Sequence, residues 1–340
     1  MIIVMVPGAK DSDIKRVLAR LEQRGYGHHI SAGVERTIIG AIGANEREKQ
    51  QVAEQLMGLP GVERVVPILK PYKMVSRDHH PDGTVVTVGA ARFGAGRVGV
   101  IAGPCTIESE KQLREAAVAV KRAGATVLRG GAFKPRSSPY DFQGLREEGV
   151  ALLGAIGREV GIPTITEVME ARQIEVVLEH VDALQIGARN MANFDLLREA
   201  GATGRTIMLK RGLAATVEEW LKAAEYVATS GNLNILLCER GIRSFDNITR
   251  FTLDLGGMAA AKLETHLPVI VDPSHSTGTH KLVSPMSLAA IAGGADGLMV
   301  EVHPHPDQAR CDGPQSLTPK RFASLMDQIR SLVHVMGETM

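Results

Sequence analysis

Apolar and polar residues follow a regular order of strand-like and helix-like segments over the first seventy positions. "MIIVMV" opens the chain as an apolar strand, and the stretch from Asp11 to Gly25 places four aliphatic residues on one helical face. "HHISA" and "ERTIIGAIG" have the composition of two strands, a second helical segment follows, and "VERVVPIL" is a last strand. This βαββαβ order predicts a small ferredoxin-like α+β domain over residues 1–70.

A different rhythm begins after a polar segment. "KPYKMVSRDHHPDGT" is interrupted by proline and glycine, and predicts a linker over residues 71–84. A short hairpin is expected at "VVTVGAARFG"; from Val98, eight apolar strands alternate with helical segments, the first "VGVIAGPCT" and the last "GLMVEVHP". Eight such units in about 240 residues favour an α/β fold, a (β/α)8 TIM barrel over residues 85–338. The alternative, a doubly wound open sheet, lacks a G-x-G-x-x-G after its first strand.

Composition and charge restrict the class of partner. The 340 residues are 44% hydrophobic and 23% charged, with a formal net charge of +1. This balance provides no overall field for nucleic acid or a membrane surface, and no apolar run approaches the roughly 18 residues of a membrane span. Cys105, Cys238 and Cys311 are widely spaced, which argues against a disulfide framework and for a reducing cytoplasm. We therefore expect a cytoplasmic protein that builds any anion site locally.

Positive charges gather where the barrel strands are expected to end, which is where barrel enzymes carry their active sites. Any one of these residues could form an ordinary salt bridge at the rim, but the complete set indicates recognition of phosphate and carboxylate groups. The mouth could hold two phosphorylated substrates, or one phosphate and a carboxylate. The cations at the strand ends are Arg129, Lys134, Arg136, Arg189, Lys210, Arg240 and Arg243.

The same strand ends carry candidate metal ligands. Cys105, His275 and Glu301 end the first, seventh and eighth strands, which are neighbours in a closed barrel. Their thiolate, imidazole and carboxylate could converge on one ion, with Asp312 from the following loop as a fourth ligand. Cys311 competes with Asp312 for that place, and we favour the carboxylate.

Two further residues have alternative roles. His303 follows Glu301 by two positions and is expected to face the same side, beside the metal ligands or the substrate. Lys210 could instead form a Schiff base, as buried lysines at barrel strand ends can. A Schiff-base aldolase would not need the cysteine, histidine and carboxylates of the metal set.

Short segments spread over nearly the whole chain carry a common resemblance. They are "GVERTIIG", "ILKPYK", "AGPC", "LRGGAFKPR", "SPYDFQGL", "QIGARN", "LKRG", "LLCERGIR", "LPVIVDPSHS", "VEVHP" and "DGPQSL". Together they resemble 3-deoxy-D-arabino-heptulosonate 7-phosphate (DAHP) synthase, in the branch with an N-terminal ferredoxin-like domain. The resemblance implies condensation of phosphoenolpyruvate with erythrose 4-phosphate and release of phosphate, the first step of the shikimate pathway.

The resemblance also implies roles for individual residues. The protein would bind one divalent ion (Mn²⁺, Fe²⁺, Zn²⁺ or Co²⁺). Basic residues at the strand ends would bind phosphoenolpyruvate, and Arg136 and Ser137 would bind the aldose phosphate. Lys134 could transfer the proton to the new alkoxide, with His303 or a metal-bound water as the other candidate. By motif, the metal ligands are Cys105, His275, Glu301 and Asp312, and the residues for phosphoenolpyruvate are Arg129, Lys134, Arg189, Lys210 and Arg240.

Two competing hypotheses remain open. The sister synthase that uses arabinose 5-phosphate to make 3-deoxy-manno-octulosonate 8-phosphate carries a "KANRSS"-type turn, whereas this chain has "KPRSS", which favours the four-carbon aldose. A second hypothesis makes the chain an amino-acid sensor in which residues 1–70 bind the ligand and the barrel is silent. The complete set of strand-end residues argues against a silent barrel.

Regulation is expected from the family branch, which is often inhibited by tyrosine or phenylalanine and suggests a homotetramer. "GHHISAGVERT" supplies His29 and Ser31 at a strand junction suited to an amino-acid ligand. The continuation "DPSHSTGTHKLV" departs from the pattern of this branch and leaves the roles of His280 and Lys281 open.

Overall fold

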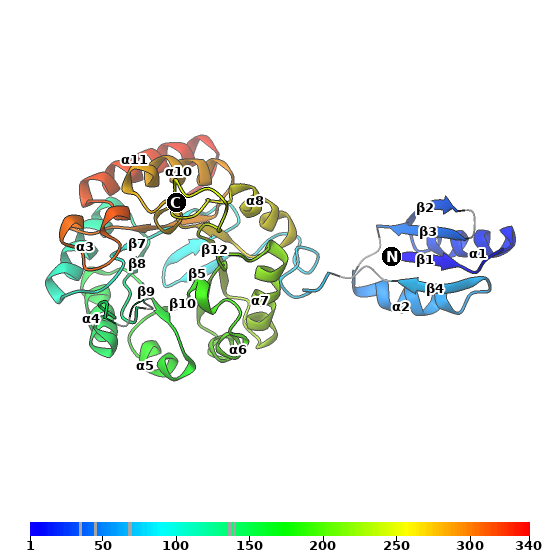
Figure 1. Ribbon diagram of the computed structural model, residues 1–340, viewed down its shortest axis with the longest axis horizontal. Helices are drawn as coiled ribbons and strands as arrows, with labels where there is room; N and C mark the ends of the chain where they lie inside the picture. The colour runs from blue at the N-terminus through cyan, green and yellow to red at the C-terminus, as the bar shows by residue number, and fades with distance from the viewer. Residues whose placement is uncertain (34–35, 44–45, 67–69, 135–137, 139) are drawn as a thin grey trace. The chain divides into compact units, whose positions relative to one another are not determined.

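The computed structural model divides the chain into two compact units, Met1–Pro71 and Tyr72–Met340. It describes all residues except 34–35, 44–45, 67–69, 135–137 and 139 (Figure 1). Within the described part of the chain, no helix is both long and apolar enough to cross a membrane.

The small unit is a four-stranded antiparallel sheet with two helices packed on it (Figure 1). The strand order is β2-β3-β1-β4, as the ferredoxin-like prediction requires. Ile3 and Met5 point from the sheet into a core with Val17 and Leu21 of the first helix. The elements are β1 (Ile2–Met5), α1 (Asp11–Glu22), β2 (Gly27–Ala32), β3 (Thr37–Ile42), α2 (Glu46–Met57) and β4 (Val62–Val66).

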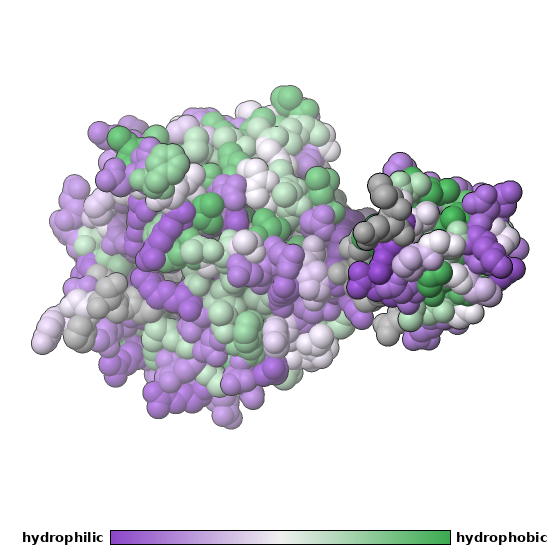
Figure 2. Space-filling view, turned by 45° about the vertical axis from the view of Figure 1, so that its right-hand side comes forward, coloured by the Kyte–Doolittle hydropathy of each residue, from purple (hydrophilic) through white to green (hydrophobic). Residues whose placement is uncertain are grey.

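The other face of this sheet is open. Hydrophobic side chains reach the surface of the small unit, Ile38 being 42% exposed and Val66 43% exposed (Figure 2). On the edge strand β2, the backbone of His29 pairs with Gly40 and that of Ser31 with Ile38, so both side chains lie on the same face as Ile38. Both side chains are exposed.

The large unit is the predicted barrel: eight parallel strands close on themselves, and helices surround them (Figure 1). Closure pairs the last strand with the first, with Glu301 opposite Gly103. The strands are β7 (Gly99–Gly103), β8 (Val127–Arg129), β9 (Thr164–Val168), β10 (Ala183–Ile186), β11 (Thr206–Lys210), β12 (Ile235–Glu239), β13 (Val269–Val271) and β14 (Gly297–Glu301). The helices are α3 (Glu110–Ala123), α4 (Arg146–Val160), α5 (Ile174–Leu178), α6 (Phe194–Ala202), α7 (Val217–Thr229), α8 (Leu255–Glu264), α9 (Pro273–Thr277), α10 (His280–Ala292) and α11 (Pro319–Val335).

The expected hairpin covers one end of the barrel. Its strands are β5 (Val86–Val88) and β6 (Ala91–Phe93), and their buried side chains form one cluster with residues near the starts of the barrel strands. Phe93 is fully buried there. An apolar plug therefore fills the N-terminal end of the barrel, and the C-terminal end carries the polar residues.

The polar segment before the hairpin lies against the barrel rather than free of it. Glu225 of α7 accepts hydrogen bonds from the backbone amides of Lys73, Met74 and Val75 at 2.9–3.0 Å. The hydroxyl of Tyr72 donates to Glu264 at 2.9 Å. Most of the sequence expected as a linker is thus fixed to the second unit.

Candidate active site

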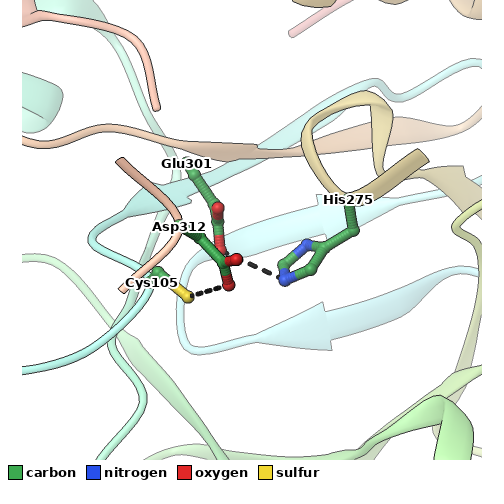
Figure 3. Close-up of side chains that lie close together, drawn as sticks. All are labelled: Cys105, His275, Glu301 and Asp312. Carbon is green, nitrogen blue, oxygen red and sulfur yellow. Dashed lines mark hydrogen bonds and ion pairs between the residues drawn. The ribbon is translucent and has the colours of Figure 1, made fainter. Parts of the chain in front are cut away.

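Four side chains at the C-terminal end of the barrel meet in one cluster: Glu301 ends β14, His275 lies in α9, and Cys105 and Asp312 lie in loops. Each of Cys105, His275, Glu301 and Asp312 offers one ligand atom, and these atoms all lie within 4.8 Å of one another (Figure 3). The thiol of Cys105 is 3.0 Å from Asp312 Oδ2, and His275 Nε2 is 3.2 Å from Glu301 Oε1. These are the four residues that the strand-end pattern predicts as metal ligands.

Local backbone geometry orients the side chains of Cys105 and Asp312 toward the cluster. At Gly103, an added Cβ would lie 2.1 Å from the carbonyl oxygen of Arg129, so only glycine fits before Cys105. Asp312 has a positive φ of 53°, a conformation that aspartate tolerates better than most residues and that is uncommon enough to mark functional loops. In this conformation its carboxylate contacts both Cys105 and, at 3.1 Å, Arg250.

The imidazole of His275 has a defined role in this cluster. Burial lowers the pKa of His275 from 6.5 to about 4, so the ring is neutral at neutral pH. Its Nδ1 lies 2.6 Å from Asp272 Oδ2, which assigns the proton to Nδ1. The unprotonated Nε2 therefore faces Glu301 Oε1 at 3.2 Å, and a cation bound by both atoms would satisfy these two acceptors.

The acidic groups are held in their ionised form. Burial alone would raise the pKa of Glu301, but His275 and Arg129 lower it to about 2. Burial also opposes ionisation of Asp312, yet Lys134 and His275 hold the pKa of that carboxyl well below its usual range. Burial raises the pKa of the Cys105 thiol, so this sulfur needs a cation to become a thiolate ligand. Sulfur, nitrogen and two carboxylate oxygens form a donor set that suits a divalent transition metal or zinc.

Further polar residues orient the four. Gln315 donates to Glu301 Oε2 at 2.6 Å, and Arg250 donates to Gln315 at 2.9 Å. Asp272 holds His275 and also accepts from Lys210 Nζ at 2.5 Å. Such outer contacts fix ligand orientation in metal sites.

A basic cavity of about 180 Å³ opens beside the cluster. Arg240 is 6% exposed, and its guanidinium lies over the ring of Phe251 with 4.3 Å to the ring centre. One terminal nitrogen of Arg240 is buried without a hydrogen-bond partner among the described residues. A buried cation left unsatisfied is costly, which indicates that an anion completes the site. The cations that line the cavity are Arg129, Lys134, Arg189, Lys210, Arg240 and Arg250.

Five predicted residues for phosphoenolpyruvate line this cavity, and two predicted residues for the aldose phosphate lie outside the described part of the chain. Lys134 Nζ is 2.6 Å from the sulfur of Cys105. The residues predicted to bind phosphoenolpyruvate are Arg129, Lys134, Arg189, Lys210 and Arg240. The two residues predicted to bind the aldose phosphate, Arg136 and Ser137, lie outside the described residues.

His303 contacts Glu108 and the backbone of His305. Its Nδ1 accepts from the backbone amide of His305 at 3.0 Å, and its Nε2 lies 3.6 Å from a Glu108 carboxylate oxygen. The ring is not among the residues that line the cavity beside the metal cluster. The backbone beyond Glu301 pairs with the segment at Leu317: Val302 forms a parallel bridge with Leu317, and the amide of His303 donates to the Leu317 carbonyl oxygen at 3.0 Å.

Three other expectations concern Cys311, Lys210 and His280. Cys311 lies 3.7 Å from Cys105 by sulfur-to-sulfur distance but is outside the group of four. Lys210 contacts a carboxylate at 2.5 Å, whereas a Schiff-base lysine must present a free amine. His280 Nδ1 contacts the carbonyl oxygen of Pro314, next to the loop that carries Asp312.

Sequence reasoning gave no role to Asp272, Arg250 or Gln315. Asp272 had a usable signal, since "DPSH" places an acid three residues before the ligand histidine. Arg250 lies in an irregular loop and Gln315 at the end of the short 3-10 helix Gly313–Gln315, and in such segments residue spacing does not indicate where a side chain points.

Two family models match the chain. The model of the DAHP synthetase I family matches residues 84–335, and that of the DAHP synthase ferredoxin-like domain matches residues 1–70. A phospho-2-dehydro-3-deoxyheptonate aldolase of Thermotoga maritima is 46% identical over 99% of this chain and 99% of that protein. A 2-dehydro-3-deoxyphosphooctonate aldolase of Magnetococcus marinus is 34% identical over 75% of this chain and 94% of that protein.

Solved structures agree with these matches. The crystal structure of the Thermotoga maritima phospho-2-dehydro-3-deoxyheptonate aldolase (DAHP synthase) superposes with a TM-score of 0.79 and 45% identity, covering 99% of this chain and 98% of that one. A truncated form of 3-deoxy-D-arabino-heptulosonate 7-phosphate synthase from the same organism superposes with a TM-score of 0.74 and 43% sequence identity. This match covers 79% of this chain and 98% of that one. With both domain models matched and a relative aligned over almost its full length, the chain belongs to the DAHP synthetase I family, in the form that carries an N-terminal ferredoxin-like domain.

Proposed function

We propose that the basic cavity and the four-residue cluster beside it form the active site in which the chain condenses phosphoenolpyruvate with erythrose 4-phosphate and water. The products are 3-deoxy-D-arabino-heptulosonate 7-phosphate and inorganic phosphate. Family membership supports the reaction. The observation that carries the site is the meeting of four potential ligands, within 4.8 Å of one another, beside a buried arginine nitrogen without a partner.

One divalent ion, Mn²⁺, Fe²⁺, Zn²⁺ or Co²⁺, fits the donor set of Cys105, His275, Glu301 and Asp312. Facing acceptors on His275 and Glu301, and a thiol that burial holds protonated, support a bound cation. When bound, the ion supplies Lewis-acid polarisation of the aldehyde of erythrose 4-phosphate.

The cavity residues bind and orient phosphoenolpyruvate. Its carboxylate and phosphate are anions, and arginine forks match both groups with paired hydrogen bonds. Arg240 has a donor without a partner among the described residues, and Arg189 lines the same cavity. We assign the phosphate of the aldose to Arg136 and Ser137, on the family resemblance alone.

Lys134 is the proposed proton donor. In the reaction, the enol carbon of phosphoenolpyruvate forms a bond to the aldehyde carbon, and the aldehyde oxygen becomes an alkoxide. Lys134 lines the cavity, and its Nζ lies 3.7 Å from Asp312 Oδ2. From this position its ammonium can protonate the new alkoxide of the substrate. Water adds to the resulting cationic carbon, and the hemiketal phosphate then releases phosphate. His303 is the weaker candidate, because its ring faces Glu108 instead of the cavity.

The four-carbon aldose is favoured over arabinose 5-phosphate. The relative named as a heptonate aldolase matches both domains at 46% identity, whereas the octonate aldolase matches 75% of the chain at 34%. Turnover with each aldose under the same conditions tests this choice. Faster turnover with arabinose 5-phosphate would overturn it.

Phosphate release from phosphoenolpyruvate and erythrose 4-phosphate tests the metal site. Chelation is expected to abolish release, and Mn²⁺ to restore it. Cys105→Ser should lose bound metal while keeping its circular dichroism spectrum. Cys238→Ala is the matched control, because Cys238 lies in the apolar cluster under the barrel, and it should keep its metal. Full metal content in Cys105→Ser would contradict the assignment.

We further propose feedback inhibition by tyrosine or phenylalanine at His29 and Ser31, and assembly as a homotetramer. The exposed apolar sheet face that carries these two residues supports contact with another copy of the chain. Rates with each amino acid, for the unaltered enzyme and His29→Ala, test the inhibition. Light scattering tests the assembly. The absence of any effect on rate by either amino acid would refute the regulatory proposal.

A further inference from the structure

One carboxylate connects the proposed metal ligands to the cations that bind substrate. Asp272 follows β13, is fully buried, and caps the N-terminus of α9 by accepting the backbone amide of His275 at Oδ1, 2.9 Å away. Its other oxygen, Oδ2, accepts from two side chains: His275 Nδ1 at 2.6 Å and Lys210 Nζ at 2.5 Å. The two donors therefore share one oxygen atom.

The two donors belong to different parts of the site. His275 is one of the four clustered ligands, and Lys210 lines the basic cavity. Lys210 is 4% exposed, and Asp272 is the carboxylate that neutralises its charge. A ligand that changes either hydrogen bond must therefore change the other.

We propose that Asp272 is a positioning residue that couples the two halves of the site, so that metal and phosphoenolpyruvate each raise the affinity for the other. The proposal rests on the roles given above to His275 and Lys210.

The sign of the coupling follows from the shared oxygen. A cation held by His275 and its neighbours would draw electron density from the imidazole and would make Nδ1–H a stronger donor to Asp272. Oδ2 then binds Lys210 less tightly, and the ammonium becomes available to an anionic substrate. Conversely, an anion that attracts Lys210 leaves Oδ2 to His275, which makes the imidazole a better electron donor. Linkage requires both effects to have the same size.

Direct attraction between the metal cation and the substrate anion would also produce positive coupling. A substitution that removes the shared acceptor atom but keeps the shape of the side chain separates the part of the coupling due to Asp272 from this direct attraction. Asp272→Asn does this, because asparagine remains a good N-cap for α9 while its amide nitrogen faces two donors. The tautomer of His275 that presents Nε2 to the metal then loses its partner.

The experiment measures binding without turnover. The affinity for Mn²⁺ is determined by titration calorimetry with and without phosphoenolpyruvate, in the absence of erythrose 4-phosphate. The unaltered enzyme should show an affinity increase of about fivefold or more with phosphoenolpyruvate. Asp272→Asn should bind Mn²⁺ about 10- to 100-fold more weakly, with a coupling factor reduced severalfold. Should Asp272→Asn fail to fold, Asp272→Ser keeps a capping hydroxyl and tests the same loss.

Gln315→Leu provides the matched control. Gln315 donates to Glu301 and, in the part of the chain that the structure describes, makes no hydrogen bond to Lys210. The variant should therefore weaken Mn²⁺ binding and keep the coupling factor of the unaltered enzyme. Equal coupling factors in the unaltered enzyme and Asp272→Asn, or a factor of one in the unaltered enzyme, would overturn the inference. The proposed metal site itself fails under a different result, namely equal Mn²⁺ binding by the unaltered enzyme and Cys105→Ser.

Discussion

Replacing Arg240 by methionine is expected to stabilise the ligand-free fold and to weaken substrate binding. Arg240 is 6% exposed, and one of its terminal nitrogens has no hydrogen-bond partner within the described ranges of the chain. An unsatisfied buried donor costs about 1–3 kcal/mol, and methionine removes this donor while retaining most of the side chain's length. The substitution also loses the contact with the ring of Phe251, which offsets about 0.5–2 kcal/mol. The net gain is therefore on the order of 1 kcal/mol.

The same change should impair function. A hydrogen bond to a charged group contributes about 1.5–3 kcal/mol, which corresponds to a roughly 10- to 150-fold loss of affinity for phosphoenolpyruvate. Stability and affinity would thus move in opposite directions, as expected for a residue kept for binding rather than for folding.

Thermal melting of the metal-free enzyme and calorimetric titration with phosphoenolpyruvate measure the two effects. A gain of 1 kcal/mol corresponds to about 2–4 °C in Tm for a domain of this size class. Arg211→Met is the control, because Arg211 is equally buried but paired with Glu239 at 3.2 Å and Asp254 at 2.8 Å. Breaking that network should cost about 3–5 kcal/mol. The reasoning is refuted if both variants are destabilised alike, or if Arg240→Met binds phosphoenolpyruvate normally.

Two further perturbations test other parts of the structure. Because burial lowers the pKa of His275 from 6.5 to about 4, the unfolded chain binds more protons than the folded one between these values. The metal-free enzyme should therefore lose stability as the pH falls from about 6.5 towards 4, and His275→Gln should reduce that slope in denaturant titrations; an unchanged slope would contradict the assignment. Glu225→Ala should expose the segment around residues 72–76 to limited proteolysis while phosphate release persists, since Glu225 accepts three backbone amides there. Equal cleavage rates would show that other contacts hold the segment.

The strand-end residues were predictable because the geometry of a closed parallel barrel is nearly fixed. Once the eighth strand pairs with the first, Cys105 and Glu301 must end on neighbouring strands, and the structure has Glu301 opposite Gly103. Three metal-ligand candidates, Cys105, His275 and Glu301, could therefore be chosen from order along the chain, and Asp312 was added because a carboxylate was favoured over the thiol of Cys311. The choice of Asp312 over Cys311 agrees with the cluster that the structure forms.

The orientation of side chains in the loops that follow the strands could not be predicted in this way. His303 was expected by alternation to face the metal ligands or the substrate, which stays a prediction, and its ring lies 3.6 Å from Glu108. Arg250 reaches Asp312 from a loop without regular spacing. The polar segment before the hairpin was expected as a linker from its composition, which carries no information about Glu225, far away in sequence.

The hairpin of β5 and β6 makes the barrel a blind-ended well, because Phe93 and its neighbours fill the floor with apolar side chains. Everything that reacts must enter and leave through one opening. The reactant seated deeper has to arrive first, and the product must clear the mouth before the next round can begin. The single opening therefore imposes an order on substrate binding and product release that a barrel open at both ends would not impose.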